Sequence, residues 1–198
     1  MLTYEDCLGL SELTPQEIEV IASHERLPAI AALQLGDYFC RSPGGKQIIK
    51  KMMLEEAAAA CRRGNTRVAG KLGVILHHFM QDRCDRHGSA EPISEICVGG
   101  ALKREQVDAF LTAMLRHFGI DRAPAAERFA PEMQVAEMCC GTCSETDRCR
   151  RFLESDIKTA PDFCPNAPLL DELSRSMRAA DRIHDRGSDL QHEVGTSR

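Results

Sequence analysis

Five of the ten cysteines in this 198-residue chain lie within the 26 positions from Cys139 to Cys164. Four of them follow the spacing C-x2-C-x5-C-x14-C, and a proline follows the last. A C-x2-C pair lets two sulfurs converge on one centre across a single turn of backbone. Four thiolates complete the coordination of a tetrahedral zinc ion or of an iron–sulfur cluster. The spacing therefore predicts a fold that brings four side chains together, hereafter the cysteine quartet: Cys140, Cys143, Cys149 and Cys164.

The residues around the quartet favour an iron–sulfur cluster. Ser144 can cap a helix that begins at Glu145, which would place Cys143 at a helix N-terminus, where the dipole stabilises a thiolate. Cys164 precedes Pro165, as the closing cysteine of ferredoxin-type runs does. Zinc sites commonly use two C-x2-C pairs, whereas here three cysteines cluster and the fourth stands alone. We predict a [4Fe–4S] cluster; a zinc ion and a segment without metal are the alternatives. Three arginines add positive charge along the same turns: Arg148, Arg150 and Arg151.

The choice between the adjacent residues Cys139 and Cys140 follows from their spacing to Cys143. Consecutive side chains point in different directions, so both rarely bind one centre. Cys140 has the two-residue gap, and Gly141 within that gap tolerates the backbone angles of a tight turn. We therefore expect Cys140 to be the ligand and Cys139 to be a core or spare thiol.

The remaining patterns predict helices, and no run alternates as a strand would. Thr14 stands before Pro15 and Glu17 in the arrangement of a capping box. Residues 46–63 are strongly helical in composition, and Gly64 ends the pattern. The next segment completes a helical hairpin. Its expected inner stripe is Leu72, Ile75, Leu76 and Phe79. Four methionines on helical stripes are expected in the core: Met52, Met53, Met80 and Met114.

These patterns divide the all-α chain into a helical bundle followed by a metal module. Residues 1–87 form the helical module, and the glycine- and proline-punctuated residues 88–101 form a linker. Residues 102–178 form the cysteine-rich metal-binding module, in which Asn166 is expected to cap the last helix. Residues 179–198 lack an apolar stripe and are expected to form a flexible tail.

Composition indicates which partners and which cellular compartment to expect for the protein. The net charge is −5 with no basic block, so nucleic acid is not an expected partner. The N-terminus lacks the features of a signal peptide, and the apolar runs are too short to span a membrane. We therefore expect a cytoplasmic protein. Because thiols stay reduced there, clustered cysteines indicate ligands or redox groups rather than structural disulfides.

Three segments carry a resemblance to a known family: "MLRHFGID", "CGTCSETDRCRRFL" and "PDFCPNAPLLDEL". On these, residues from about 102 to 174 resemble DUF6455, a bacterial family without an established activity. The resemblance implies the module boundaries and the cysteine set. The C-x2-C-x5-C block also looks like part of the WhiB-type iron–sulfur regulators, but here the isolated cysteine follows the block and no basic tail is present. Residues 1–87 look like short alphaproteobacterial proteins without known function.

Outside the quartet, the candidate residues have simpler interpretations. His77, Cys84 and His87 share helical spacing and could line a second metal face, although histidines near a helix end are more often solvated. Nucleotide-binding, hydrolase and metalloprotease motifs do not occur, so no enzyme is predicted. The other cysteines fall in helical stretches and are expected to behave as small apolar residues: Cys7, Cys40, Cys61, Cys84 and Cys97.

Two functions follow from these observations. The first function is that of an iron–sulfur protein that transfers electrons or senses redox state. Four thiolates leave no open coordination position for substrate chemistry, so outer-sphere electron transfer is favoured. It implies a protein redox partner or a larger redox complex. The alternative is a non-catalytic interaction protein or accessory subunit whose zinc ion only folds the C-terminal module.

Overall fold

The computed structural model describes residues 3–83, 103–155 and 157–193. Within these ranges the chain forms ten α-helices and no strand, which confirms the all-α prediction. The N-terminal half contains α1 (Tyr4–Leu10), α2 (Pro15–Glu25), α3 (Ala29–Arg41), α4 (Gly45–Arg62) and α5 (Thr66–Arg83). The C-terminal half contains α6 (Arg104–His117), α7 (Arg122–Arg128), α8 (Ala130–Gly141), α9 (Thr146–Leu153) and α10 (Ala167–Glu193).

Local sequence signals set the ends of several helices. At the start of α2, the Glu17 amide donates to Thr14 Oγ1 at 3.3 Å, and the Thr14 amide donates to Glu17 Oε2 at 2.7 Å. This reciprocal pair is the predicted capping box. After α4, Gly64 adopts a φ of 74°, a left-handed conformation that glycine takes without a Cβ clash. Asn65 Oδ1 then accepts the Val68 amide in the first turn of α5.

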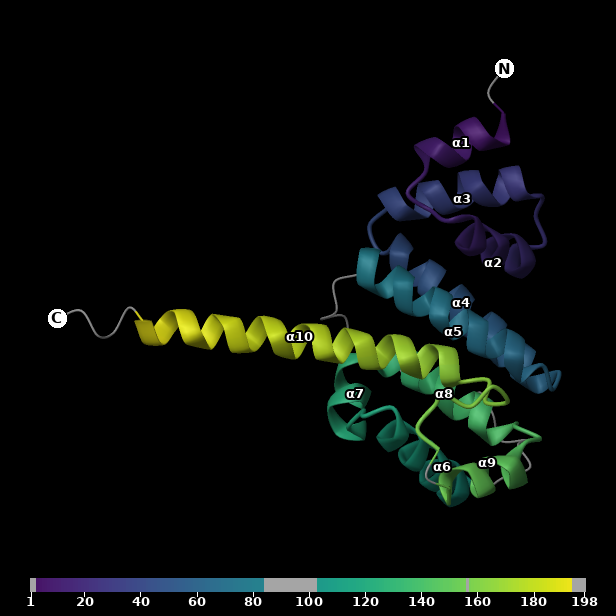
Figure 1. The fold of residues 1–198 in the computed structure, drawn as a ribbon. Helices are drawn as coiled ribbons and strands as arrows, with labels where there is room; N and C mark the ends of the chain where they lie inside the picture. Colours follow the sequence, from purple (N-terminus) through teal and green to yellow (C-terminus); the bar gives the residue numbers. More distant parts are fainter. Residues whose placement is uncertain (1–2, 84–102, 156, 194–198) are drawn as a thin grey trace.

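The helices enclose two apolar cores that meet at α5 and α8. The first core joins α2 to α5 and also takes in residues from α8, among them Val135 and Met138. The second core joins α6, α7, α8 and the start of α10 around Phe129, with Val74 of α5 packed against it. In Figure 1, α4 and α5 lie between the α1–α3 group and the helices α6–α9. The four predicted core methionines are buried: Met52, Met53, Met80 and Met114.

Helix α5 faces both cores, so its buried face is wider than the inner stripe that the sequence predicted. Leu76 and Phe79 are fully buried, whereas Leu72 and Ile75 are half-buried. On its other side, α5 approaches the loop before α10 very closely. A Cβ built on Gly70 would overlap the carbonyl oxygen of Pro165. The N-terminal half therefore supports the backbone of the residue that follows Cys164.

Helix α10 extends well past the point where a tail was expected. The sequence has no apolar stripe after residue 179, yet the helix continues to Glu193 and projects from the body in Figure 1. A helix that has already formed lengthens without a new nucleation step, and no proline interrupts this stretch. The expected linker at 88–101 lies outside the described residues, so the division into modules stays a prediction.

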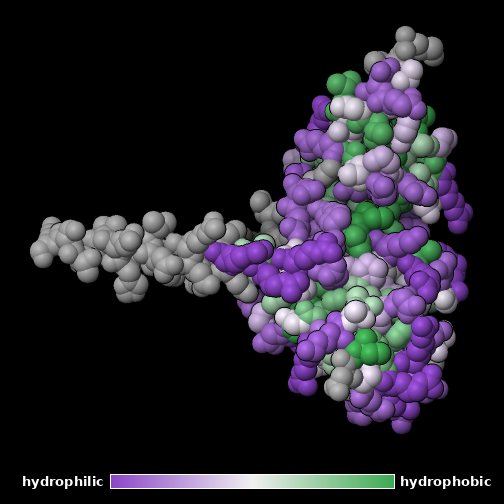
Figure 2. Space-filling model, in the orientation of Figure 1, coloured by the Kyte–Doolittle hydropathy of each residue, from purple (hydrophilic) through white to green (hydrophobic). Residues whose placement is uncertain are grey.

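The surface is mainly hydrophilic on the face shown in Figure 2, with green apolar groups scattered over both the N-terminal helices and the lower part of the body. Among the described residues, no helix combines the length and the apolar character that crossing a membrane requires.

Candidate metal centre

All four side chains of the quartet line one cavity, which has a volume of about 30 Å³. Cys140 lies near the end of α8, and Cys143 follows in the connection to α9. Cys149 lies on α9, and Cys164 lies in the loop before α10. Cys139 also reaches this space, hereafter the thiol cavity. The fold thus brings together the residues that the spacing singled out.

Apolar side chains form much of the remaining wall of the thiol cavity. Phe110 and Met114 contribute from α6, and Phe163 contributes from the loop before α10. The Phe163 ring packs against Phe152 at 5.8 Å between ring centroids, and the Arg148 guanidinium lies 4.6 Å from the Phe163 centroid. An apolar shell of this kind limits solvent access to a bound group and lowers the local dielectric constant.

Amide groups donate hydrogen bonds to sulfurs of the quartet. Asn166 Nδ2 donates to Cys140 Sγ at 3.3 Å, and the Glu145 backbone N–H donates to Cys143 Sγ at 3.4 Å. The backbone N–H groups of Asn166 and Ala167 bond to Cys164 and act to lower the pKa of its thiol. Donors aimed at sulfur stabilise the thiolate form, which is the form that binds a metal.

Burial nevertheless raises the pKa of each thiol in the quartet above its usual value. For Cys149, burial and then the charges of Cys164 and Cys143 raise the pKa to about 11. The pKa of Cys140 is raised by burial first and then by the other three thiols. Four close thiolates repel one another, so at neutral pH the quartet stays protonated unless a cation offsets the repulsion.

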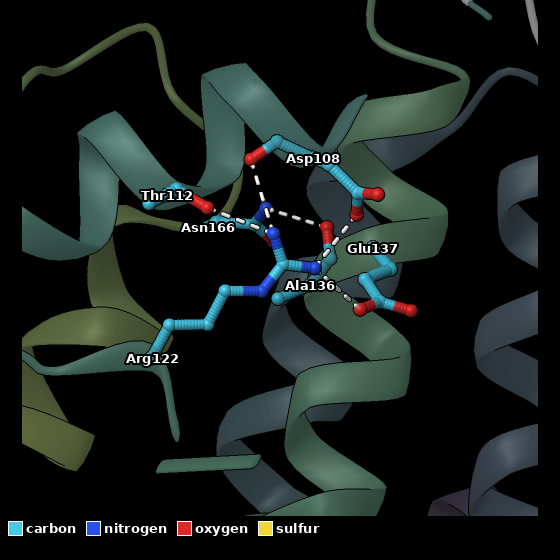
Figure 3. A network of polar contacts seen from close by, with 6 residues as sticks. All are labelled: Asp108, Thr112, Arg122, Ala136, Glu137 and Asn166. Atoms are coloured by element: carbon cyan, nitrogen blue, oxygen red, sulfur yellow. Dashed lines mark hydrogen bonds and ion pairs between the residues drawn. The ribbon is translucent and has the colours of Figure 1, made fainter. Parts of the chain in front are cut away.

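Asn166 and Arg122 each donate hydrogen bonds to α8, as Figure 3 shows. The Asn166 side chain donates to the Ala136 carbonyl of α8 at 2.9 Å as well as to Cys140. Arg122 of α7 donates to Asp108 of α6 at 2.7 Å and to Glu137 of α8 at 3.2 Å. These contacts fix α8, which carries Cys140, relative to its neighbours.

Two capping predictions near the quartet are wrong in detail. Helix α9 begins at Thr146, and its N-cap position is Glu145, without a side-chain cap from Ser144. The Glu145 amide bonds to the sulfur of Cys143, two residues before it. Asn166 does precede α10, but its side chain points to α8 and does not cap the helix. The bond from Asn166 to α8 was not predicted. The only signal for it in the sequence is an amide side chain two residues after Cys164.

The donors fit a metal in chemical type and number, because four soft thiolates suit zinc or iron–sulfur clusters. Within the described part of the chain, no group of three or more His, Cys, Asp or Glu side chains is arranged to hold a metal ion as it stands. The quartet therefore shares a cavity without converging on a single point. Coordination would require the cysteine side chains to change rotamer.

The other candidate residues have structural roles or lie outside the described residues. His77 is fully buried, which corrects the expectation of a solvated histidine. Its Nδ1 lies 3.0 Å from Glu132 Oε1, and its Nε2 lies 3.0 Å from Ser176 Oγ. Cys61 is buried as expected, whereas Cys7 and Cys40 are only half-buried. Three predicted positions fall outside the described residues: Cys84, His87 and Cys97.

Comparison with known proteins supports the resemblance of the cysteine segment. Residues 100–176 match DUF6455, which is described as a family of unknown function. This part of the chain contains the whole quartet and is therefore a DUF6455-like segment. No curated protein and no solved structure matches the chain.

Proposed function

We propose that the quartet binds a [4Fe–4S] cluster and that the protein carries electrons or senses redox state. The observation that carries this proposal is the placement of four cysteines from separate segments around one cavity. The N–H donors on their sulfurs add support, because such bonds help to set the potential of a thiolate-bound cluster. Arg148, Arg150 and Arg151 are exposed on α9, and their charge would partly offset that of the cluster.

Four thiolates would occupy every protein-ligand position of the cluster, so we propose electron exchange or cluster loss rather than substrate chemistry. The side chains of the quartet are half-buried. A cluster there would lie close to the surface, within reach of a protein redox partner or of a larger complex. A reducing compartment such as the cytoplasm belongs to this proposal, because the thiols must stay unoxidised to be loaded.

Zinc is the second candidate, and the small volume of the thiol cavity favours it. A single ion bound by four thiolates needs less space than a cluster with its own sulfides. In that case the metal would fold the C-terminal module, and the protein would act as an interaction protein or an accessory subunit.

Anaerobic purification followed by an electronic absorption spectrum separates these functions. A brown protein whose broad visible absorption bleaches on reduction would support the cluster. A colourless protein with stoichiometric zinc would support the second candidate and overturn the first. A colourless protein that holds neither metal would overturn both.

A further inference from the structure

Hydrogen bonds join a serine, a histidine and a glutamate that come from three helices far apart in the chain. Ser176 lies on α10, His77 on α5 and Glu132 on α8. Ser176 Oγ lies 3.0 Å from His77 Nε2, and His77 Nδ1 lies 3.0 Å from Glu132 Oε1. These three residues, hereafter the Ser–His–Glu row, have the order of nucleophile, base and orienting acid that activates serine in unrelated enzymes.

The inner end of the row is shielded from water. His77 is fully buried, and Glu132 is 1% exposed. An ionised carboxylate only accepts hydrogen bonds, so His77 Nδ1 carries the proton that it donates to Glu132. The Nε2 atom then keeps the lone pair that can take the proton of the Ser176 hydroxyl. The Phe129 ring packs edge-on against the imidazole, with 5.5 Å between the ring centroids, and helps to hold its plane.

Glu132 carries an energetic cost that packing alone does not explain. Its second oxygen, Oε2, is buried and has no hydrogen-bond partner among the described residues. A buried carboxylate that is only half satisfied is destabilising, so an apolar side chain at this position would give a more stable core. Local costs of this kind are typical of functional sites.

The outer end of the row reaches the surface of the protein. Ser176 is half-buried, and the neighbouring Gln81 on α5 is exposed. Gln81 Nε2 donates to Ser176 Oγ and also contacts His77 Nε2. An amide N–H at this place can donate to the oxyanion that forms when a serine attacks a carbonyl group. A small ester that arrives from the solvent side therefore meets the hydroxyl, its base and a hydrogen-bond donor together.

We propose that Ser176 is a nucleophile for small carboxylic esters, with His77 as its base and Glu132 as the positioning residue. The Ser176 oxygen attacks the ester carbonyl carbon as its proton moves to His77 Nε2. The bond to the alcohol oxygen then breaks, and the alcohol leaves with that proton, so Ser176 is acylated. Water next gives a proton to His77 and attacks the acyl group. The bond from the acyl carbon to the serine oxygen breaks, the carboxylic acid leaves, and Ser176 regains the proton.

No electron is exchanged in these steps, so the activity does not depend on the function proposed for the quartet. The row and the quartet also share no residue. A metal-free protein should therefore retain the ester activity.

A fluorophosphonate probe tests the nucleophile in the full-length protein. Its phosphorus bonds to a serine oxygen that an adjacent base activates, and fluoride leaves. Cleavage after glutamate gives the peptide 173–193, in which fragment spectra separate Ser176 from two other serines. Labelling of Ser176 should be about 100-fold faster than that of Ser42, which is also half-buried but donates its hydroxyl to the Tyr38 carbonyl. Labelling of Ser176 that is absent, or no faster than that of Ser42, would overturn the proposal.

Glu132→Gln tests the positioning residue. The glutamine amide can donate to His77 Nδ1 and so move the ring proton to Nε2, which removes the base. Labelling of Ser176 should then fall at least about tenfold, and nitrogen NMR of the imidazole should report the change of tautomer. Glu137→Gln, on the same helix, is the matched control and should change neither. A folded Glu132→Gln protein with the wild-type labelling rate and tautomer would overturn the role of Glu132.

Hydrolysis of p-nitrophenyl acetate tests the substrate class. The rate should fall at least about tenfold in Ser176→Ala and stay at the wild-type value in Ser42→Ala. Circular dichroism checks that both variants keep their helix content. An equal rate in the wild type and in Ser176→Ala would overturn the ester activity.

Discussion

Cys139 and Cys140 are neighbours in the chain but lie in different surroundings. Cys140 accepts a hydrogen bond from Asn166, and its thiol feels the charges of all three other members of the quartet. Cys139 is fully buried, and its Sγ lies 3.7 Å from the Thr66 carbonyl oxygen at the start of α5. The assignment of Cys140 as the ligand follows from its spacing to Cys143 and stays a prediction.

Serine substitutions at the two positions should therefore differ in effect. Cys140→Ser should abolish metal retention, because a serine hydroxyl is a poor substitute for a thiolate ligand. Cys139→Ser should retain metal and lose about 1 kcal/mol of unfolding free energy, since it places a hydroxyl in the core. Metal analysis and urea unfolding of both variants measure these effects. Metal kept in Cys140→Ser and lost in Cys139→Ser would reverse the assignment.

Asn166 should affect both stability and the metal centre. Asn166→Leu keeps the approximate shape but removes the amide that bonds to the Ala136 carbonyl and to Cys140. Losing the buried hydrogen bond to the Ala136 carbonyl should cost about 1 kcal/mol of unfolding free energy. A bound cluster should also show a lower reduction potential, because N–H bonds to sulfur favour the more negative, reduced state.

Redox titration and urea unfolding measure the two effects of Asn166→Leu. Asn65→Ala is the matched control, since Asn65 Oδ1 accepts the Val68 amide in α5 rather than bonding to a residue of the quartet. The control should lower stability and leave the potential unchanged. An unchanged potential in Asn166→Leu would mean that this residue is only structural.

At the scale of elements, the close contact between α5 and the Pro165 loop determines how the cavity is supported. Gly70→Ala should be destabilising by about 1–3 kcal/mol, because the new methyl group meets a backbone carbonyl that cannot rotate away. This cost exceeds the gain of about 1 kcal/mol that alanine brings to a helix. Metal retention should also fall, since the shifted loop carries Cys164.

Gly9→Ala provides the control for the glycine in α5. Gly9 lies in α1, and a Cβ built there meets nothing within 4 Å. The control should gain up to about 1 kcal/mol and retain metal fully. Thermal unfolding and metal content of both variants measure these effects. A Gly70→Ala protein that is as stable as the wild type and retains as much metal would contradict the close approach of Gly70 to the Pro165 carbonyl.

The helix pair α2–α4 carries a pH-dependent contact at His24. Burial alone lowers the pKa of His24, but hydrogen bonds and charges from Glu55 and Glu25 outweigh it and raise the pKa above 6.5. The resulting stabilisation is fully present below pH 6.5 and is lost as the pH rises through the higher folded-state pKa. Because the contact is partly solvated, we expect less than about 1 kcal/mol.

His24→Gln should accordingly reduce the unfolding free energy at about pH 6 more than at about pH 8. Urea unfolding at both values measures the difference. His78→Gln, at an exposed position on α5, serves as the control for a general effect of losing a histidine. An equal loss at both pH values would show that the contact does not depend on protonation.

Helix ends that depend on a few adjacent residues could be predicted from the sequence, whereas contacts between distant segments could not. The capping box at Thr14 and the helix end at Gly64 depend on adjacent residues, and both were predicted. The cap at Ser144 was wrong because α9 begins one residue later, at Thr146, and Glu145 occupies the N-cap position. The contact of Gly70 with Pro165 joins segments far apart in the chain, and no local pattern indicates it.

At the scale of the whole molecule, the two halves pack as one body around shared helices. Helix α5 contributes to both cores, and α8 contributes Met138 to the first and Met133 to the second. The cysteine spacing predicted which thiols would share a cavity. It could not predict that Val135, Met138 and Cys139 of α8 would join the first core, because this packing depends on how the two halves meet.

Metal and acid-labile sulfide content of the anaerobically purified wild-type protein tests the central claim most directly. A cluster on the quartet requires about four iron atoms and about four sulfides per chain. Replacement of the quartet by serines should remove both, whereas replacement of Cys7 and Cys40 should leave both unchanged. We expect this stoichiometry and this dependence. A wild-type chain that contains zinc in stoichiometric amounts, or that contains neither zinc nor iron with sulfide, would contradict the cluster.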